Sequence, residues 1–101
     1  MRVVFTKSAR QDLRAIALRI AERNPKRALT YIGELEGYCK DITPFPDAGT
    51  PRPQWGVGVL TRYFGRYIIV FRSRDGAVQI LRIVHGARKL DALFEDEPLP
   101  E

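Results

Sequence analysis

The sequence has one cysteine, one histidine and no long apolar run, and each scarcity excludes a class of protein. Cys39 cannot form an internal disulfide, and with His85 as the lone histidine it cannot build a structural zinc site. Only Ser8 and Ser73 offer serine hydroxyls, no nucleophile–histidine–acid pattern is visible, and no glycine-rich phosphate loop is present. We therefore expect neither a metal nor a cofactor. With no bilayer-length apolar run and no apolar signal segment, we expect a cytoplasmic protein without a membrane partner.

Acidic residues are scarce in most of the chain. Residues 1–89 hold all 17 Lys and Arg but only seven acids, whereas residues 90–101 hold five acids and no base. A basic body implies an anionic partner, either nucleic acid or an acidic protein surface, unless the charge is only a solvated face. The length fits one domain over residues 1–101. Its last part, residues 95–101, carries acids and prolines and is expected to be a flexible acidic tail.

Apolar spacing predicts two helices joined by a tight turn. The first should span about residues 7–23 with Thr6 as its N-cap, and Asn24 and Pro25 should begin the second, which ends before Pro44. Cys39 falls on the apolar stripe of the second helix, which predicts a buried thiol. The two stripes are Ala9, Leu13, Ile16 and Ile20, then Ala28, Ile32, Leu35, Cys39 and Ile42.

Two further features of the second helix and the segment after it carry predictions. Gly33 and Gly37 lie four residues apart, and because glycine costs helix stability we expect another backbone to approach closely there. Residues 44–58 form a long loop rich in proline and glycine. Trp55 within it is either a buried anchor for the loop or a contact for a partner.

Strand patterns fill the rest of the chain. Arg2–Phe5 is a short β-rich run, and runs at 59–64, 67–72 and 78–85 are separated by the turn pairs Gly65-Arg66 and Asp75-Gly76. Residues 88–94 predict a short helix or turn. The fold class is therefore α+β, with an N-terminal strand, a two-helix hairpin and a three-stranded antiparallel meander in a curved sheet. The hairpin covers one face; the other has no helix of its own and must be polar or bind something.

His85 stands where the last strand leaves the sheet, a place that holds a side chain rigidly yet exposed. Its side chain either forms a structural hydrogen bond to the backbone at the end of the strand or takes part in binding or catalysis. The only chemistry this composition supports is acid–base work on a phosphodiester. The alternation of side chains along a strand puts Arg82 on the sheet face opposite His85, so the two are not obvious partners. Arg72 and Arg82 have a second interpretation, as ordinary strand residues that face solvent. The candidates for such chemistry are Arg62, Arg66, Arg82, His85 and Arg88.

Five segments in this order resemble the ParE-type toxins of the ParE/RelE superfamily, from type II toxin–antitoxin modules. The opening Phe5-Thr6-x-x-Ala9-x-x-Asp12-Leu13-x-x-Ile16 and the turn Asn24-Pro25-x-x-Ala28 are similar to the family's first half. The loop is similar in Gly49-x-x-Arg52-Pro53-x-x-Gly56-x-Gly58. The sheet is similar in Gly65-Arg66-Tyr67-x-Ile69-x-Phe71-Arg72 and in Asp75-Gly76-x-Val78-x-Ile80-Leu81-Arg82-Ile83-Val84-His85-Gly86-Ala87-Arg88.

The resemblance implies a RelE-like α+β domain, a ParD-like antitoxin as partner and DNA gyrase as target, with growth arrest and plasmid stabilisation as the outcome. Operator DNA would be bound through the antitoxin, so direct nucleic-acid binding is not required. RelE-type relatives instead cut mRNA on the ribosome, often with a C-terminal Tyr and with Lys side chains. This chain has no Tyr after Tyr67 and no Lys between Lys40 and Lys89, which favours a gyrase poison without chemistry of its own. Leu60 stands where many ParE-like chains carry Arg, and Arg62 points to the same face.

We predict three sets of site residues, of which the first two overlap. A nuclease would use Arg62, His85 and Arg88. Target binding is assigned to Arg62, Arg66, His85, Arg88 and Lys89. Antitoxin binding is assigned to Leu13, Ile20, Trp55, Tyr63, Arg72 and Arg82.

Overall fold

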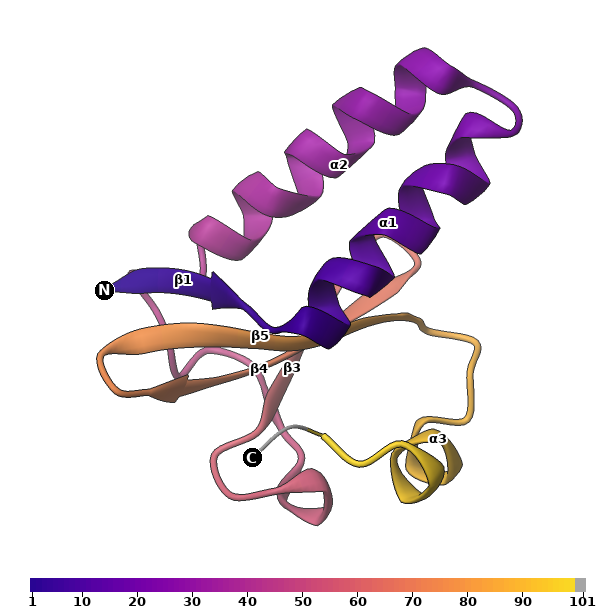
Figure 1. The fold of residues 1–101 in the computed structure, drawn as a ribbon. Coiled ribbons are helices and arrows are strands. Elements are labelled where there is room, and N and C mark those ends of the chain that lie inside the picture. The colour runs from indigo at the N-terminus through magenta and orange to yellow at the C-terminus, as the bar shows by residue number, and fades with distance from the viewer. Residues whose placement is uncertain (100–101) are drawn as a thin grey trace.

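A five-stranded sheet carries an α-hairpin on one face and a short helix on the other (Figure 1). The structure is a computed structural model and describes residues 1–99. The elements are β1 (Arg2–Phe5), α1 (Lys7–Ala21), α2 (Pro25–Lys40), β2 (Thr50–Pro51), a 3-10 turn η1 (Pro53–Trp55), β3 (Leu60–Phe64), β4 (Tyr67–Arg74), β5 (Ala77–His85) and α3 (Leu90–Asp96). The predicted α+β class and its order of elements are confirmed.

The strands lie in the order β1-β5-β4-β3-β2. β1 runs parallel to β5 and forms one edge of the sheet, while all other pairings are antiparallel. The two-residue strand β2 at the opposite edge was not predicted, because Thr50 and Pro51 lie in a segment whose composition indicates a loop. Pro51 is tolerated there because an edge strand has a side that needs no ladder hydrogen bond.

Both predicted helix starts are confirmed by their caps. The Thr6 hydroxyl accepts a hydrogen bond from the Ala9 amide at 3.1 Å, and the Asn24 side-chain oxygen accepts one from the Arg27 amide at 3.0 Å. Pro25 occupies the first turn of α2 as expected. α1 ends at Ala21, two residues before the predicted end. No helix of the described residues is long and apolar enough to cross a membrane.

The helix stripes pack against the sheet as the spacing indicates. Cys39 is fully buried, as predicted, and burial raises the pKa of its thiol to about 12. We call this layer the helix-side core. Its buried members are Ala9, Ile16, Leu35, Cys39, Ile42, Tyr67, Ile69, Phe71, Val78, Ile80 and Ile83.

The expectation that the second sheet face lacks a helix is wrong. α3 lies over that face (Figure 1), where Phe94 is 7% exposed, and Trp55 packs beside it from the loop. The sequence indicated a short helix or turn here. Its docking was not predicted, because it depends on Trp55, which lies 36 positions before its hydrogen-bond partner Asp91 in α3. The α3-side core consists of Val59, Ile68, Val70, Leu81, Val84 and Phe94.

The expected backbone contact at Gly33 and Gly37 is also wrong. A Cβ atom placed on either glycine would meet no other atom within 4 Å. Both residues therefore face open space on α2, and close packing inside this chain does not explain them.

Candidate functional site

The turn between β3 and β4 and the end of β5 lie side by side. The Gly86 amide donates a 2.8 Å hydrogen bond to the Arg66 carbonyl, and Tyr67 pairs with His85 in the sheet. A Cβ on Gly86 would lie 3.2 Å from that carbonyl oxygen, so glycine permits the close approach. Arg66 and Arg88 are exposed and His85 is half-buried. Sheet pairing thus brings three of the predicted target-binding residues together.

His85 has the structural role that its position favours. Its Nδ1 accepts a hydrogen bond from the Ala87 amide at 3.1 Å, and its ring lies edge-on to Tyr67 with centroids 5.6 Å apart. With Nδ1 acting as acceptor, the neutral imidazole carries its hydrogen on Nε2. Nε2 is therefore the nitrogen left to meet a partner.

A small cleft of about 80 Å³ separates α1 from the end of β5. His85 and Arg88 line it from one side, and Arg19 of α1 lines it from the other. The space equals only a few water molecules, so a single anionic group would fill it. Sequence reasoning missed Arg19, although it sits one turn before the predicted end of the first helix. We call Arg19, Arg66, His85 and Arg88 the basic end of the molecule.

Asp12 of α1 clamps this region to β5. Its carboxylate accepts hydrogen bonds from Arg82 Nε at 2.8 Å, from Arg82 Nη2 at 3.1 Å and from the Ile83 amide at 2.9 Å. Glu97 accepts a further bond from Arg82 Nη1 at 3.3 Å. The hydrogen bond to Asp12 raises the pKa of Arg82 above its ordinary value, and Glu97 adds to the shift. Arg82 bonds with these acids rather than with His85.

The alternative that Arg82 is solvent-facing is wrong, since only 9% of the residue is exposed. A register shift between β4 and β5 pairs Val70 with Arg82 and Phe71 with Ile80, leaving Leu81 without a cross-strand partner. Such a bulge re-aims side chains, a change that simple alternation does not anticipate. Asp12 was visible in the sequence only as part of the family's opening motif.

Arg62 lies on β3 with its guanidinium over the Tyr38 ring of α2, 5.1 Å from the centroid. Leu60 packs against the helix-side core, so Leu60 and Arg62 share a face as expected. Tyr38 in turn lies 5.2 Å from Phe64, ring to ring. Arg62 is thereby held toward the α-hairpin by an aromatic ring. Lys89, the fifth predicted target contact, is exposed immediately before α3.

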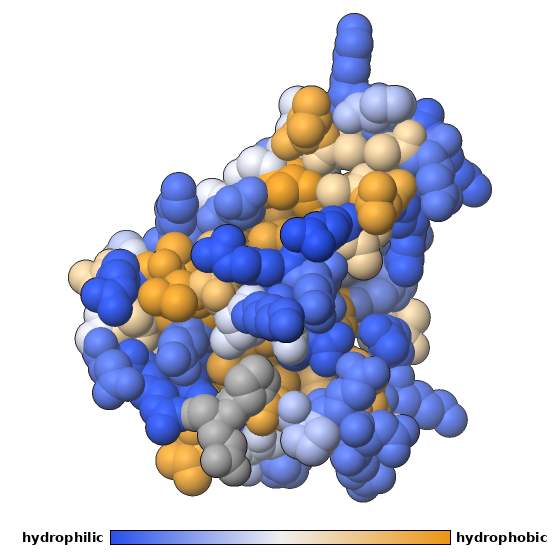
Figure 2. Space-filling model, viewed as in Figure 1, coloured by the Kyte–Doolittle hydropathy of each residue, from blue (hydrophilic) through white to orange (hydrophobic). Residues whose placement is uncertain are grey.

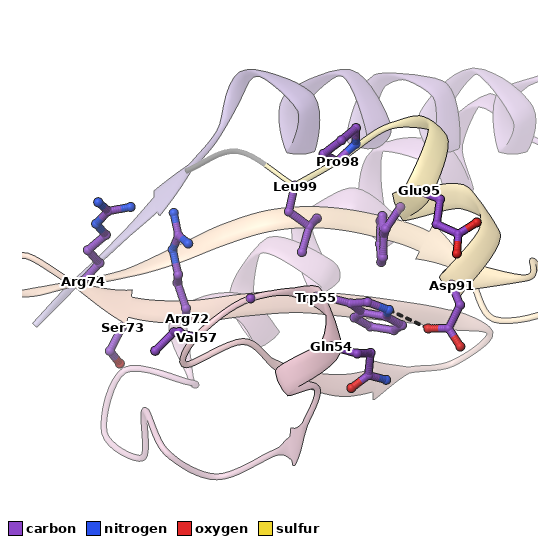
Figure 3. A pocket seen from close by; sticks show the side chains of 12 residues that line it. Gln54, Trp55, Val57, Arg72, Ser73, Arg74, Asp91, Glu95, Pro98 and Leu99 are labelled. Atoms are coloured by element: carbon purple, nitrogen blue, oxygen red, sulfur yellow. Dashed lines mark hydrogen bonds between the residues drawn. The ribbon is translucent and has the colours of Figure 1, made fainter.

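A second, larger hollow of about 1040 Å³ opens between the loop and α3 (Figure 3). Trp55 Nε1 donates a 2.6 Å hydrogen bond to Asp91, and its ring meets Phe94 edge-on at 4.8 Å. Trp55 is half-buried and anchors the loop to α3, and its contact with a partner stays a prediction. Arg72 and Val57 also line this groove, and Val57 is 95% exposed.

The residues predicted to bind an antitoxin do not form one surface. Leu13 and Ile20 are half-buried against the helix-side core, and Trp55 lines the groove with Arg72. Tyr63 is 59% exposed near Gly86 at the basic end. Arg82 is buried within the clamp that Asp12 forms. In the predicted acidic tail, Glu95 and Asp96 are part of α3 and Glu97 bonds Arg82, while residues 100–101 lie outside the described residues.

Comparison with known proteins decides the family. A model described as "ParE toxin of type II toxin-antitoxin system, parDE" matches residues 3–90. The chain belongs to the ParE toxin family.

Two solved structures show the same fold. The chromosomal ParDE toxin–antitoxin system from P. aeruginosa is 27% identical with a TM-score of 0.73, over 84% of this chain and 95% of that chain. The RelBE2 toxin–antitoxin complex from Mycobacterium tuberculosis is 25% identical with a TM-score of 0.60, over 86% and 92%. A comparison with curated proteins gives no match. ParE membership makes this chain a toxin of a type II toxin–antitoxin system.

Proposed function

We propose that this ParE-family toxin arrests growth by binding DNA gyrase in the bacterial cytoplasm, and that a ParD-like antitoxin neutralises it. The observation that carries the target proposal is the basic end. Arg19, Arg66 and Arg88 come from three separate segments, and no ion pair within residues 1–99 engages any of them. Cations held in this way are available to an acidic surface on another protein.

The same region supports binding better than chemistry. His85 has one ring nitrogen engaged by the Ala87 amide, and the nearest acid in the cleft, Asp12, is committed to Arg82. General acid–base cleavage needs groups that can take and return a proton. A protein-binding surface needs complementary charge and an exposed anchor, and Tyr63, exposed beside Gly86, supplies an aromatic one. Neither requires proton transfer, so the toxin poisons its target without a reaction of its own.

A supercoiling titration tests the target. Purified gyrase, plasmid and increasing toxin are incubated, and supercoiled and cleaved DNA are scored on one gel. We expect loss of supercoiling with linear DNA appearing. The double variant Arg66→Gln/Arg88→Gln should shift the inhibitory concentration by about tenfold or more, because removing each exposed cation weakens association with an acidic surface. The matched control Lys26→Gln/Lys40→Gln removes equal charge from α2 and should inhibit like the parent.

Unchanged supercoiling at saturating toxin would contradict the gyrase proposal. It would favour the second candidate, ribosome-dependent mRNA cleavage, which is the activity that the sequence resemblance implies for RelE-type relatives. The chain is also similar in fold to the RelBE2 complex. In that case Arg62, His85 and Arg88 would act on the phosphodiester, and His85→Ala should abolish cleavage while leaving ribosome binding intact. A gyrase poison with the same substitution should instead bind gyrase more weakly.

The antitoxin proposal uses the groove and the open edge of the sheet. Trp55 and Arg72 line the groove, Leu13 and Ile20 give the α-hairpin an apolar side, and β1 leaves one backbone edge unpaired in the described structure. An acidic helix followed by an extended strand suits this combination. Operator DNA would be bound through the antitoxin, with plasmid stabilisation as the outcome. Hydrogen exchange on the complex with a ParD-like antitoxin should show protection at β1; exchange there at the free rate would contradict strand addition.

A further inference from the structure

The outer face of α1 carries a row of bases that the functions above do not use. Lys7, Arg10 and Arg14 recur at spacings of three and four, which places them on one side of the helix. All three are exposed. Figure 2 shows strongly hydrophilic side chains over the first half of α1, with apolar ones gathered nearer the space between the two helices. We call these three residues the α1 basic row.

Nothing within residues 1–99 neutralises this row. The ion pairs of that part of the chain are Arg27 with Glu34 and Arg82 with Asp12 and Glu97, so Asp12, the one acid within α1, is turned toward β5. The first turn of α1 contains no acid. Arg10 instead lies over the Phe5 ring, with its guanidinium 6.0 Å from the centroid.

The charge of the row is also unfavourable with respect to the helix dipole. The positive end of the dipole lies at the N-terminus, where acids are favourable and bases are not. Lys7 is the first residue of α1 and Arg10 follows within the first turn. A helix built for stability alone would carry the opposite sign here. Retaining bases at this end is reasonable when the charge serves a partner.

The chemistry of the face identifies the partner. Among the residues sharing this side, Gln11 is polar and Leu18 is the only exposed large apolar side chain. A protein interface normally centres on aromatic or aliphatic anchors, which the row lacks. Arginine forks bind phosphate oxygens two at a time, and a straight helix of about 10–12 Å diameter fits a duplex groove.

We propose that the α1 basic row binds the phosphate backbone of a nucleic-acid double helix. This goes beyond the proposed gyrase target and does not depend on it, because DNA binding is measured without gyrase. Double-stranded DNA and double-stranded RNA both supply the phosphates, and the experiment distinguishes them.

The experiment is a fluorescence anisotropy titration of the full chain into a labelled duplex of about 20 base pairs of DNA at several salt concentrations. Each phosphate bound by a cation contributes about −0.9 to the slope of log affinity against log salt. Arg10→Gln/Arg14→Gln removes two of these cations and should flatten the slope by about 1.8. If affinities converge at about 1 M salt, this corresponds to roughly a 60-fold decrease in affinity at about 0.1 M. Lys26→Gln/Lys40→Gln, the equal-charge control on α2, should keep the parental slope.

Three results would overturn the proposal. The first is that the parent protein fails to bind the duplex at about 50 mM salt. The second is that both double variants flatten the slope of log affinity against log salt equally, which would show only an effect of net charge. The third is that polyglutamate of the same total charge competes for the protein as effectively as unlabelled DNA, which would assign the row to an acidic protein. Equal binding of duplex RNA supports backbone phosphate as the common ligand, and preference for DNA assigns the source to B-form DNA. Circular dichroism of each variant checks that α1 remains folded.

Discussion

Replacing Asp12 by alanine should cost this toxin more stability than removing any other single acid among the described residues. Asp12 accepts two bonds from Arg82 and one from the Ile83 amide, at 2.8, 3.1 and 2.9 Å. It joins α1 to β5 across 70 positions of sequence. Asp12→Ala leaves the Arg82 side chain, which is 11% exposed, with Glu97 as its one ion-pair partner among the described residues, and leaves the Ile83 amide without its acceptor.

The size of the effect follows from the charge left behind. Removing one partner of a buried ion pair destabilises by about 3–5 kcal/mol, because the remaining charge is neither solvated nor paired. A domain of this size has a total stability of about 5–15 kcal/mol, so a large fraction is lost. The midpoint of thermal unfolding should fall by roughly 12–40 °C, at about 4–8 °C per kcal/mol. Glu97 reduces the cost little, since its side chain is 61% exposed.

Urea unfolding followed by circular dichroism measures the effect. Asp12→Asn serves as the matched variant, because its amide oxygen still accepts from Ile83 while the charge is gone, and it should lose about half as much. The double variant Asp12→Leu/Arg82→Met removes both charges and should recover the part of the loss that comes from the unpaired guanidinium, since apolar pairs of similar volume often replace buried ion pairs without cost. The Ile83 amide stays without its acceptor, so the recovery is partial. A loss below about 1 kcal/mol for Asp12→Ala, or no recovery in the double variant, would refute this reasoning.

Three further predictions concern other parts of the fold. Lys7→Glu should raise stability by about 0.5 kcal/mol because it complements the α1 dipole, and should weaken duplex binding; urea unfolding and anisotropy check the two effects, and a stability loss would contradict the first. Cys39 has a pKa of about 12 when folded, so between its ordinary value near 9 and 12 the unfolded chain releases a proton that the folded chain retains. As the pH rises above about 9, the free energy of unfolding should therefore fall by about 1.4 kcal/mol per pH unit relative to that of Cys39→Ala. Urea unfolding of both proteins from about pH 8 to 11 measures this, and parallel curves of stability against pH would contradict it. Phe94→Ala should shift the emission of Trp55, the sole tryptophan, to longer wavelength as α3 loosens, and an unchanged spectrum would show that Phe94 does not hold it.

Much of the fold follows from patterns that are local in sequence. The helix caps Thr6 and Asn24, the two apolar stripes and the turns at Gly65 and Asp75 each depend on residues a few positions apart. Asp75 and Gly65 adopt positive φ in those turns, as their residue types favour. Such signals survive in any context, which is why the hairpin and the meander were predicted with ends near the observed ones.

The functional site stays a prediction, and its residues are harder to select from sequence because their placement depends on packing. His85 was selected because a histidine at a strand end is conspicuous in sequence, and Arg66 and Arg88 because they flank predicted strand ends. Arg19 was missed, because nothing local distinguishes it from the other arginines of α1. Its position in the cleft depends on how α1 lies across β5.

The sequence by itself therefore determined the α+β class, the caps, the order of elements and the family resemblance, all of which rest on short-range spacing. Tertiary structure alone decided which charges are paired. It buries Arg82 against Asp12, which lies 70 residues earlier in the chain. It docks α3 against Trp55, which lies 36 residues before its hydrogen-bond partner Asp91. It also leaves the α1 basic row without an ion pair among the described residues. The physical reason is that Coulomb attraction and burial depend on distance in space, and only the packed chain sets that distance.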